Sequence, residues 1–98
     1  MAKAYWIASV DVTNPDAYAN YVAEAPAAIA AHGGRFMARG GEAHQLEGEG
    51  RSRNVIIEFP SLAQARACWE SDAYQRARTH RETAGDVSIV VVEGVSES

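Results

Sequence analysis

Three side chains in this sequence have the chemistry to hold an anion or to move a proton: His32, Arg39 and Glu58. Glu58 lies between Ile57 and Phe59, so a carboxylate interrupts an apolar stretch of the kind found in buried strands. In a shared pocket, Arg39 would fix a carboxylate or an enolate, and Glu58 or His32 would transfer a proton. These residues are the candidate catalytic set, although their spacing shows no nucleophile–base–orienter arrangement.

The same three residues also have structural interpretations, which we favour. A tight hairpin turn centred on Gly48 and Glu49 would bring Arg39 directly opposite Glu58, and the resulting ion pair would fix the strand register or the geometry of a dimer. His32 precedes two glycines, where a histidine at a helix end interacts with the terminal carbonyl groups. Whether Arg39 and Glu58 are a structural pair or a site stays open at this stage.

Aromatic side chains supply a candidate ligand-binding wall for a planar molecule: Tyr5, Tyr18, Trp69 and Tyr74. Core packing is the alternative. It is favoured for Trp69, because Leu62 and Ala65 share its face at helical spacing. Cys68 lies in the interior of the same predicted helix, which is typical of an inert buried thiol.

The sequence argues against several classes of partner and cofactor. Its formal net charge of -4 is unlike that of a nucleic-acid-binding surface. Its arginines at 76, 78 and 81 are expected on a solvated helix face, with one of them as a candidate to reach the mouth of a pocket. The histidines have no metal-ligand spacing, so we predict no metal site. The paired glycines match neither nucleotide-binding motif, and we predict no cofactor.

Cysteine use and hydropathy point to a soluble protein. With one cysteine, the chain can form no internal disulfide, which favours a reducing compartment. No leader opens the sequence and no apolar run is long enough to span a bilayer. We therefore expect a cytoplasmic location and no membrane partner.

Two apolar periods alternate along the chain and predict the elements that position these residues. Period-two patterns predict strands over Ala4–Val12, over Arg35–Ala43, from Asn54 to Pro60, and over Val87–Glu93. Helical spacing predicts a helix from Pro15 to His32, kinked or ended at Pro26, then a helix after Ser61 that is capped again at Ser71-Asp72. Gly40-Gly41 is expected to mark a β-bulge, and residues 42–53 are polar and turn-like.

This β-α-β-β-α-β order predicts an α+β, ferredoxin-like fold with a four-stranded antiparallel sheet and both helices on one face. The first strand is apolar on both sides, with Trp6 and Ala8 on one and Tyr5 and Ile7 on the other. One helix layer covers only one of these sides, so the open sheet face predicts a homodimer formed by sheet-to-sheet stacking. We expect one domain over residues 1–95 and a loose tail over residues 96–98.

The chain resembles the DUF1330 proteins (domain of unknown function) of the dimeric α/β-barrel superfamily. The resemblance covers nearly the whole chain and rests on these segments: Tyr5-Trp6-Ile7-Ala8, Thr13-Asn14-Pro15, His32-Gly33-Gly34-Arg35-Phe36, Arg39-Gly40-Gly41, Ile57-Glu58-Phe59-Pro60-Ser61, Trp69 with Ser71 and Tyr74, and Glu93-Gly94. It implies a homodimer with a small pocket in each subunit, and it implies no particular activity.

Two function classes follow. The first is a small-molecule-binding or purely structural dimer module, which we favour. The second is a cofactor-independent enzyme of the monooxygenase or isomerase type, because the wider superfamily contains such enzymes; its haem-handling members are a more distant precedent. Fold-level analogy alone does not choose between these classes.

Overall fold

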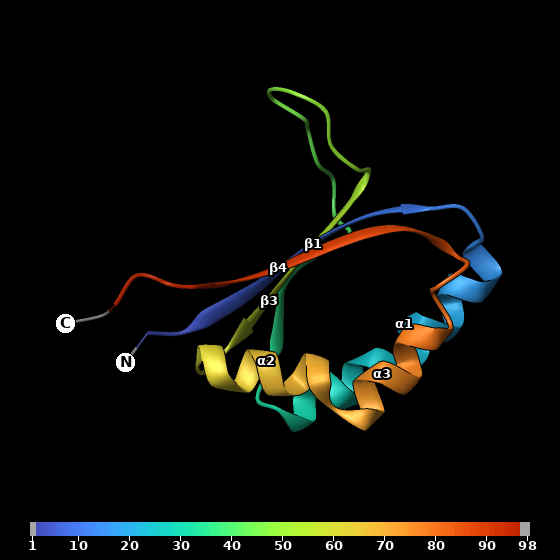
Figure 1. Cartoon of the computed structure of the whole chain (residues 1–98). Coiled ribbons are helices and arrows are strands. Elements are labelled where there is room, and N and C mark those ends of the chain that lie inside the picture. Colours follow the sequence, from blue (N-terminus) through green and yellow to red (C-terminus); the bar gives the residue numbers. More distant parts are fainter. Residues whose placement is uncertain (1, 97–98) are drawn as a thin grey trace.

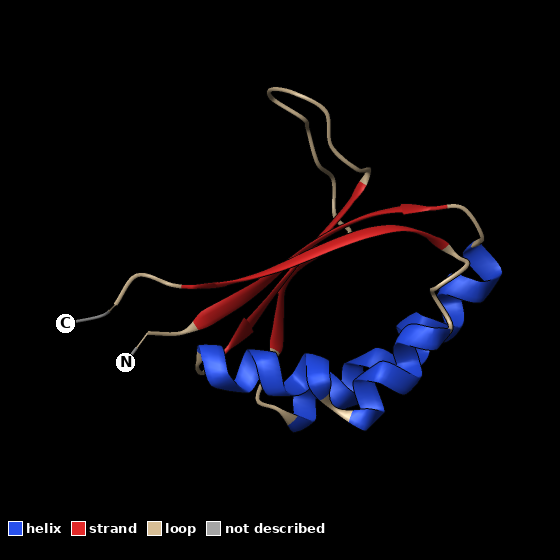
Figure 2. Cartoon of the chain, in the orientation of Figure 1, coloured by secondary structure: helices blue, strands red, loops and turns tan. Residues whose placement is uncertain are grey.

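The computed structural model describes residues 2–96 and contains one sheet and three helices (Figure 1). In chain order the elements are β1 (Ala4–Val12), α1 (Pro15–Ala31), β2 (Arg35–Arg39), β3 (Arg53–Phe59), α2 (Leu62–Glu70), α3 (Asp72–Thr79) and β4 (Gly85–Glu93). All the helices lie on one face of the sheet (Figure 2). The predicted ferredoxin-like fold is confirmed, with its second helix divided in two. Of the expected tail, residues 97–98 lie outside the described part of the chain.

The sheet is antiparallel throughout, with strand order β2-β3-β1-β4. Because successive side chains of a strand point to opposite faces, β1 sends Trp6 and Ala8 toward the helices and Tyr5 and Ile7 toward the open face. The helix-facing residues form the core with Ile57 and with residues of all three helices. Both predicted faces of the first strand are therefore confirmed.

Helix α1 begins where the sequence predicts it. The side chain of Asn14 accepts a hydrogen bond from the backbone N–H of Ala17 at 3.2 Å, and Pro15 occupies the first turn, where no donor is lost. The helix continues through Pro26 as one element to Ala31, so it does not end at the proline. Gly33 then ends the helical region at a φ of 77°, a left-handed conformation that favours glycine.

The second strand differs from the prediction. It ends at Arg39 and not at Ala43, and its register shifts between Phe36 and Ala38, so the irregularity lies at Met37 and not at Gly40-Gly41. Arg39 lies opposite Val55. Residues 40–52 form a long loop that rises from the sheet on the side away from the helices (Figure 2).

Ser71 divides the second helical region, as its sequence predicts. Its hydroxyl donates to the carbonyl oxygen of Cys68 at 2.7 Å and accepts from the backbone N–H of Tyr74 at 3.2 Å. One side chain therefore ends α2 and caps α3, and the chain changes direction between them. Among residues 2–96, no helix is both long and apolar enough to cross a membrane.

Candidate functional site

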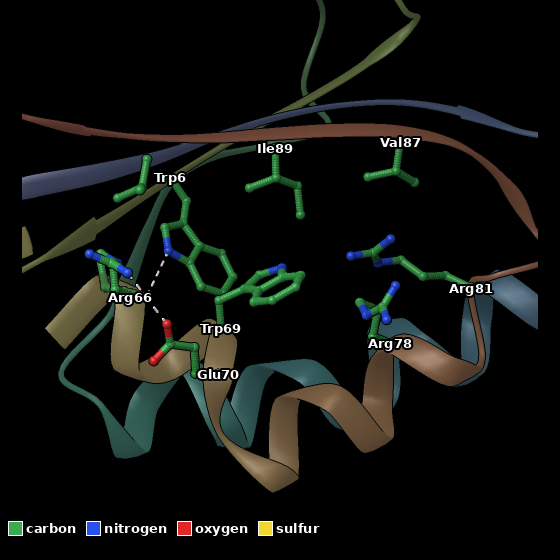
Figure 3. Close-up of a pocket in the computed structure, with 10 residues that line it drawn as sticks. Trp6, Arg66, Trp69, Glu70, Arg78, Arg81, Val87 and Ile89 are labelled. Atoms are coloured by element: carbon green, nitrogen blue, oxygen red, sulfur yellow. Dashed lines mark hydrogen bonds and ion pairs between the residues drawn. The ribbon is translucent and has the colours of Figure 1, made fainter. Parts of the chain in front are cut away.

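A cavity of about 380 Å³ opens between the sheet and the α2–α3 segment (Figure 3). Its lining comes from three regions: the sheet strands β1 and β4, helix α2, and the end of α3 with the turn that follows it. The lining residues are Trp6, Ala65, Arg66, Trp69, Glu70, Arg78, Arg81, Val87, Ile89 and Val91. The cavity is thus walled by apolar and aromatic side chains and bordered by arginines.

The aromatic wall of the cavity contains one buried residue, Trp6, and one accessible residue, Trp69. Trp6 is 2% exposed, and its indole N–H donates to the carbonyl oxygen of Ala65 at 3.0 Å. Tyr74 packs edge-on against Trp6 with the ring centroids 5.0 Å apart. Trp69 is 40% exposed and projects from α2 into the cavity (Figure 3). A planar ligand could therefore contact Trp69 without displacing the core.

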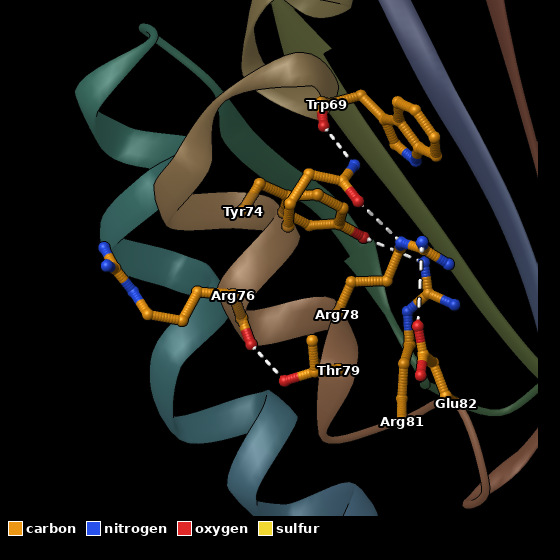
Figure 4. Close-up of polar contacts among 8 residues, drawn as sticks. Trp69, Tyr74, Arg76, Arg78, Thr79, Arg81 and Glu82 are labelled. Atoms are coloured by element: carbon orange, nitrogen blue, oxygen red, sulfur yellow. Dashed lines mark hydrogen bonds and ion pairs between the residues drawn. The ribbon is translucent and has the colours of Figure 1, made fainter.

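Arg81, at one end of the cavity, belongs to a polar cluster with Tyr74 and Tyr21, which lie behind the cavity lining (Figure 4 shows Arg81 and Tyr74). Nη2 of Arg81 donates to the hydroxyl of Tyr74 at 3.3 Å, and the hydroxyls of Tyr74 and Tyr21 lie 2.7 Å apart. The guanidinium of Arg81 also lies 5.2 Å from the centroid of the Tyr21 ring. Burial, and then the neighbouring Tyr74, raise the pKa of Tyr21 well above its ordinary value.

The arginines of the cavity differ in their partners. Arg66 lies 3.7 Å from a carboxylate oxygen of Glu70, and Arg78 lies 3.7 Å from one of Glu82. Arg81 is 8% exposed and has no carboxylate within 4.0 Å among residues 2–96. Burial alone would lower the pKa of Arg81, but Tyr74 and Tyr21 raise it, so the guanidinium stays charged.

A second, smaller cavity of about 40 Å³ lies between α1 and the sheet and shares Trp6, Arg81, Val87 and Ile89 with the larger one. Tyr18 and Arg39 both line it. The guanidinium of Arg39 lies 4.2 Å from the centroid of the Phe36 ring, so this side chain faces the helices.

The expected pairing of Arg39 with Glu58 is wrong. Arg35, and not Arg39, is the register partner of Glu58. The connection over residues 40–52 is a long loop and not a tight turn, which places Arg39 opposite Val55, and the irregularity at Met37 shifts the pairing by one further residue. Arg39 pairs with Val55, a buried residue on the helix side, whereas Glu58 is three residues further along β3 and faces the open side. The structure therefore separates these two candidate residues by the thickness of the sheet.

Glu58 is held by its own set of partners on the open face. Nε of Arg35 donates to it at 3.1 Å, Nζ of Lys3 lies 3.5 Å away, and the Tyr5 hydroxyl donates at 3.4 Å. Desolvation would raise the pKa of Glu58, but the charges of Lys3 and Arg35 outweigh it and hold this pKa below its ordinary value. Glu58 is thus an ionised carboxylate in a cross-strand network.

His32 lies apart from both cavities. It caps the carboxyl end of α1, and its Nδ1 donates to the carbonyl oxygen of Ala28 at 2.9 Å. This contact matches the structural interpretation of a helix-end histidine, since it satisfies one of the terminal carbonyl groups.

The candidate aromatic residues divide between three places. Trp69 lines the larger cavity, and Tyr74 lies directly behind it in the core. Tyr18 lines the smaller cavity, and Tyr5 lies on the open sheet face beside Glu58. Core packing, favoured above for Trp69, does not describe this partly exposed side chain.

Sequence reasoning did not single out Arg81, since it placed the three arginines of this helix on a solvated face and left open which of them would reach a pocket. Its backbone N–H donates to the carbonyl oxygen of Arg78 at 3.0 Å, so the turn after α3 keeps a helical path. The sequence did contain a signal for the burial of Arg81. Helical spacing places Arg81 on the same side as Tyr74 and Ala77, and both of these residues are fully buried. Cys68 is 0% exposed, so the prediction that it is buried is confirmed, and burial raises the pKa of its thiol to about 11.

Comparison with solved structures supports the fold. A protein of unknown function from Rhodopseudomonas palustris superposes with a TM-score of 0.73 at 22% sequence identity, covering 98% of this chain and 85% of that one. The cofactor-independent oxygenase SnoaB from Streptomyces nogalater superposes with a TM-score of 0.65 at 10% identity, covering 99% of this chain and 97% of that one. At such identities the likeness shows the shared fold alone.

No curated protein matches the chain. The DUF1330 family, described as "Domain of unknown function", matches residues 3–95, which is nearly the whole sequence. This match agrees with the resemblance found in the sequence motifs and with the observed ferredoxin-like topology. The chain therefore belongs to the DUF1330 family.

Proposed function

We propose that this protein binds a small organic molecule in the cavity between the sheet and the α2–α3 segment, and that it acts as a homodimer joined through the open sheet face. The observation that carries the binding proposal is the cavity itself. Its volume of about 380 Å³ falls within the range of roughly 300–1,000 Å³ that is typical of ligand sites. Six of its ten lining residues are apolar or aromatic, as in most such sites, and the other four are charged.

Protein interiors are close-packed and contain few voids larger than a water molecule. A space of about 380 Å³ beside Trp6 and Ile89 forfeits dispersion contacts that larger side chains on α2 or β4 would make. Trp69, a large aromatic residue at this boundary, remains 40% exposed. A ligand against Trp69 would restore the missing contacts.

The dimer proposal rests on the open face of the sheet. Large apolar side chains are exposed there on three adjacent strands: Ile7 at 43%, Ile56 at 36%, Val90 at 56% and Val92 at 45%. Ile7 is the register partner of both Ile56 and Val90, so these side chains form one contiguous patch. Continuous apolar patches of this kind mark interfaces. A second copy of this chain, with its loop of residues 40–52 rising on the same side, would cover the patch (Figure 1).

Catalysis is the second candidate, favoured by one observation: the charged guanidinium of Arg81 lines the cavity and is held by the tyrosine hydroxyls behind it. Such a group could stabilise an anionic intermediate. The candidate catalytic set of His32, Arg39 and Glu58 does not come together in this cavity. Glu58 lies on the open face of the sheet, and His32 lies outside both cavities. We therefore place binding ahead of catalysis.

A calorimetric titration with the neutral planar probe 2-naphthamide tests the binding proposal. The wild-type protein should bind the probe, and Val91→Trp should abolish binding, because Val91 lines the cavity and an indole at that position would fill it. Leu46→Trp is the matched control, since Leu46 is 90% exposed in the loop and distant from the cavity lining. If the wild type binds neither this probe nor its carboxylate analogue 2-naphthoate, or if Val91→Trp binds as well as the wild type, the proposal is refuted.

A further inference from the structure

We infer that the ligand of this cavity is a planar molecule with a single carboxylate, and that Arg81 is the residue that holds the carboxylate. This inference rests on the proposed binding function and names its ligand class. It is carried by the position of Arg81, by its missing counter-ion and by the aromatic surface beside it.

Arg81 is a buried cation with no ionic partner in the described part of the chain. It is 8% exposed, and its Nε is fully buried with no hydrogen-bond acceptor among residues 2–96. An unpaired charge removed from water is costly, which is why buried charges are normally paired. The neighbouring arginines of the same cavity, Arg66 and Arg78, each have a glutamate within 4.0 Å. Arg81 is therefore the member of the set that lacks an anion.

The tyrosine cluster does not supply the missing negative charge. The raised pKa of Tyr21 keeps its hydroxyl protonated at neutral pH, because burial and the adjacent Tyr74 both disfavour the phenolate. The hydroxyl of Tyr74 accepts a hydrogen bond from Arg81 but orients the guanidinium without neutralising it. An anion from outside the chain would complete the arrangement.

The geometry indicates where the rest of such a ligand would lie. Figure 3 shows the Arg81 side chain directed along the cavity toward Trp69, beneath Val87 and Ile89 of β4. A carboxylate at the guanidinium would place the attached planar group between the Trp69 ring and these aliphatic side chains. Arg78, whose guanidinium lies 5.6 Å from the centroid of the Trp69 ring, borders the same surface. Stacking on an accessible indole suits an aromatic or conjugated ring.

The balance of charge favours a carboxylate over a phosphate. The lining contains three arginines and one glutamate, and two of these arginines already have carboxylate partners. A single unpaired guanidinium matches a monoanion, and its planar fork fits a carboxylate. A phosphate dianion would bring a second charge into walls formed by Trp6, Val87 and Ile89, where no further unpaired cation lines the cavity.

A merely structural role for Arg81 predicts a different response to mutation. If the side chain only stabilised the fold, Arg81→Met would lower the melting temperature. If the charge serves a ligand, its removal relieves an unpaired buried cation, and the melting temperature of the ligand-free protein should stay the same or rise. Tyr74 keeps its hydrogen bond to Tyr21 in this variant.

The test compares 2-naphthoate with its neutral isostere 2-naphthamide by calorimetric titration of the full chain. We expect the wild type to bind naphthoate about tenfold or more tightly than the amide, as a charge-assisted hydrogen bond would produce. Arg81→Met should remove this preference and leave the affinity for the amide within about twofold. Arg66→Met is the matched control, because Arg66 borders the same cavity but is paired with Glu70, and it should keep the preference.

The outcomes separate the two proposals. If the amide binds and naphthoate binds no better, the carboxylate inference fails while the binding function stands. If Arg81→Met weakens both probes equally and lowers the melting temperature, Arg81 is structural and the inference fails. If the wild type binds neither probe, both proposals fail. The wild-type comparison needs no variant, so it remains decisive even if Arg81→Met does not fold.

Discussion

Arg35 and Glu58 face each other across β2 and β3, with Nε of Arg35 donating to Oε1 of Glu58 at 3.1 Å. Lys3 approaches the same carboxylate from the amino end of the chain. This network lies at the edge of the exposed apolar patch of the open face. It therefore fixes strand register and surrounds the proposed dimer contact with charge.

The first prediction concerns acid stability. The pKa of Glu58 is lower in the folded protein than its ordinary value of 4.5, so its ionised form stabilises the fold above that pH, and the contribution is lost as the pH falls through the folded pKa. Glu58→Gln should therefore lose less stability than the wild type when unfolding is measured from pH 7 down to pH 3. Glu47→Gln, in the exposed loop, is the control and should follow the wild type. Parallel curves for Glu58→Gln and the wild type would contradict the assignment.

The second prediction concerns assembly. Ile7→Asp places a charge at the centre of the open-face patch and should convert the proposed dimer to a monomer at micromolar concentration, because an unpaired charge is disfavoured in an apolar interface. Sedimentation equilibrium measures the mass. Ala23→Asp is the control, since Ala23 is exposed on α1 at the other side of the molecule. A wild type that already sediments as a monomer would refute the dimer.

The third prediction concerns Cys68. Its thiol is fully buried and its pKa is raised to about 11, so the reactive thiolate is scarce at pH 8. The native protein should react with Ellman's reagent far more slowly than the protein in denaturant, which should release one equivalent because the chain has one cysteine. Cys68→Ser should show no reaction in either condition. Rapid labelling of the native wild type would show that this part of the core opens readily.

Local sequence patterns predicted the elements well where the relevant interactions are local. The cap at Asn14 and the second cap at Ser71 need only side chains within three residues of them, and both appear in the structure. Alternation along Ala4–Val12 likewise determined which residues face the helices. The motifs that resemble DUF1330 span the chain, and the family match over residues 3–95 agrees with them.

The candidate site was predicted less well because it depends on contacts between distant segments. Glu58 is paired with Arg35 instead of Arg39 mainly because residues 40–52 form a long loop in place of a tight turn, and the irregularity at Met37 adds one residue to this shift; no local pattern indicates either feature. Trp69 was recognised as a candidate wall residue, but whether it packs or lines a cavity depends on how far α2 lies from β4.

The sequence by itself determined the order of elements, their caps and the two-sided apolar character of the first strand, since helical and strand periods are properties of neighbouring residues. The tertiary structure decided the chemistry. It buried Arg81 beside Tyr74 with no carboxylate partner among residues 2–96 and formed a cavity next to Trp69. Charge compensation and empty space are relations between side chains from different elements, so they exist only once the sheet and helices have packed together.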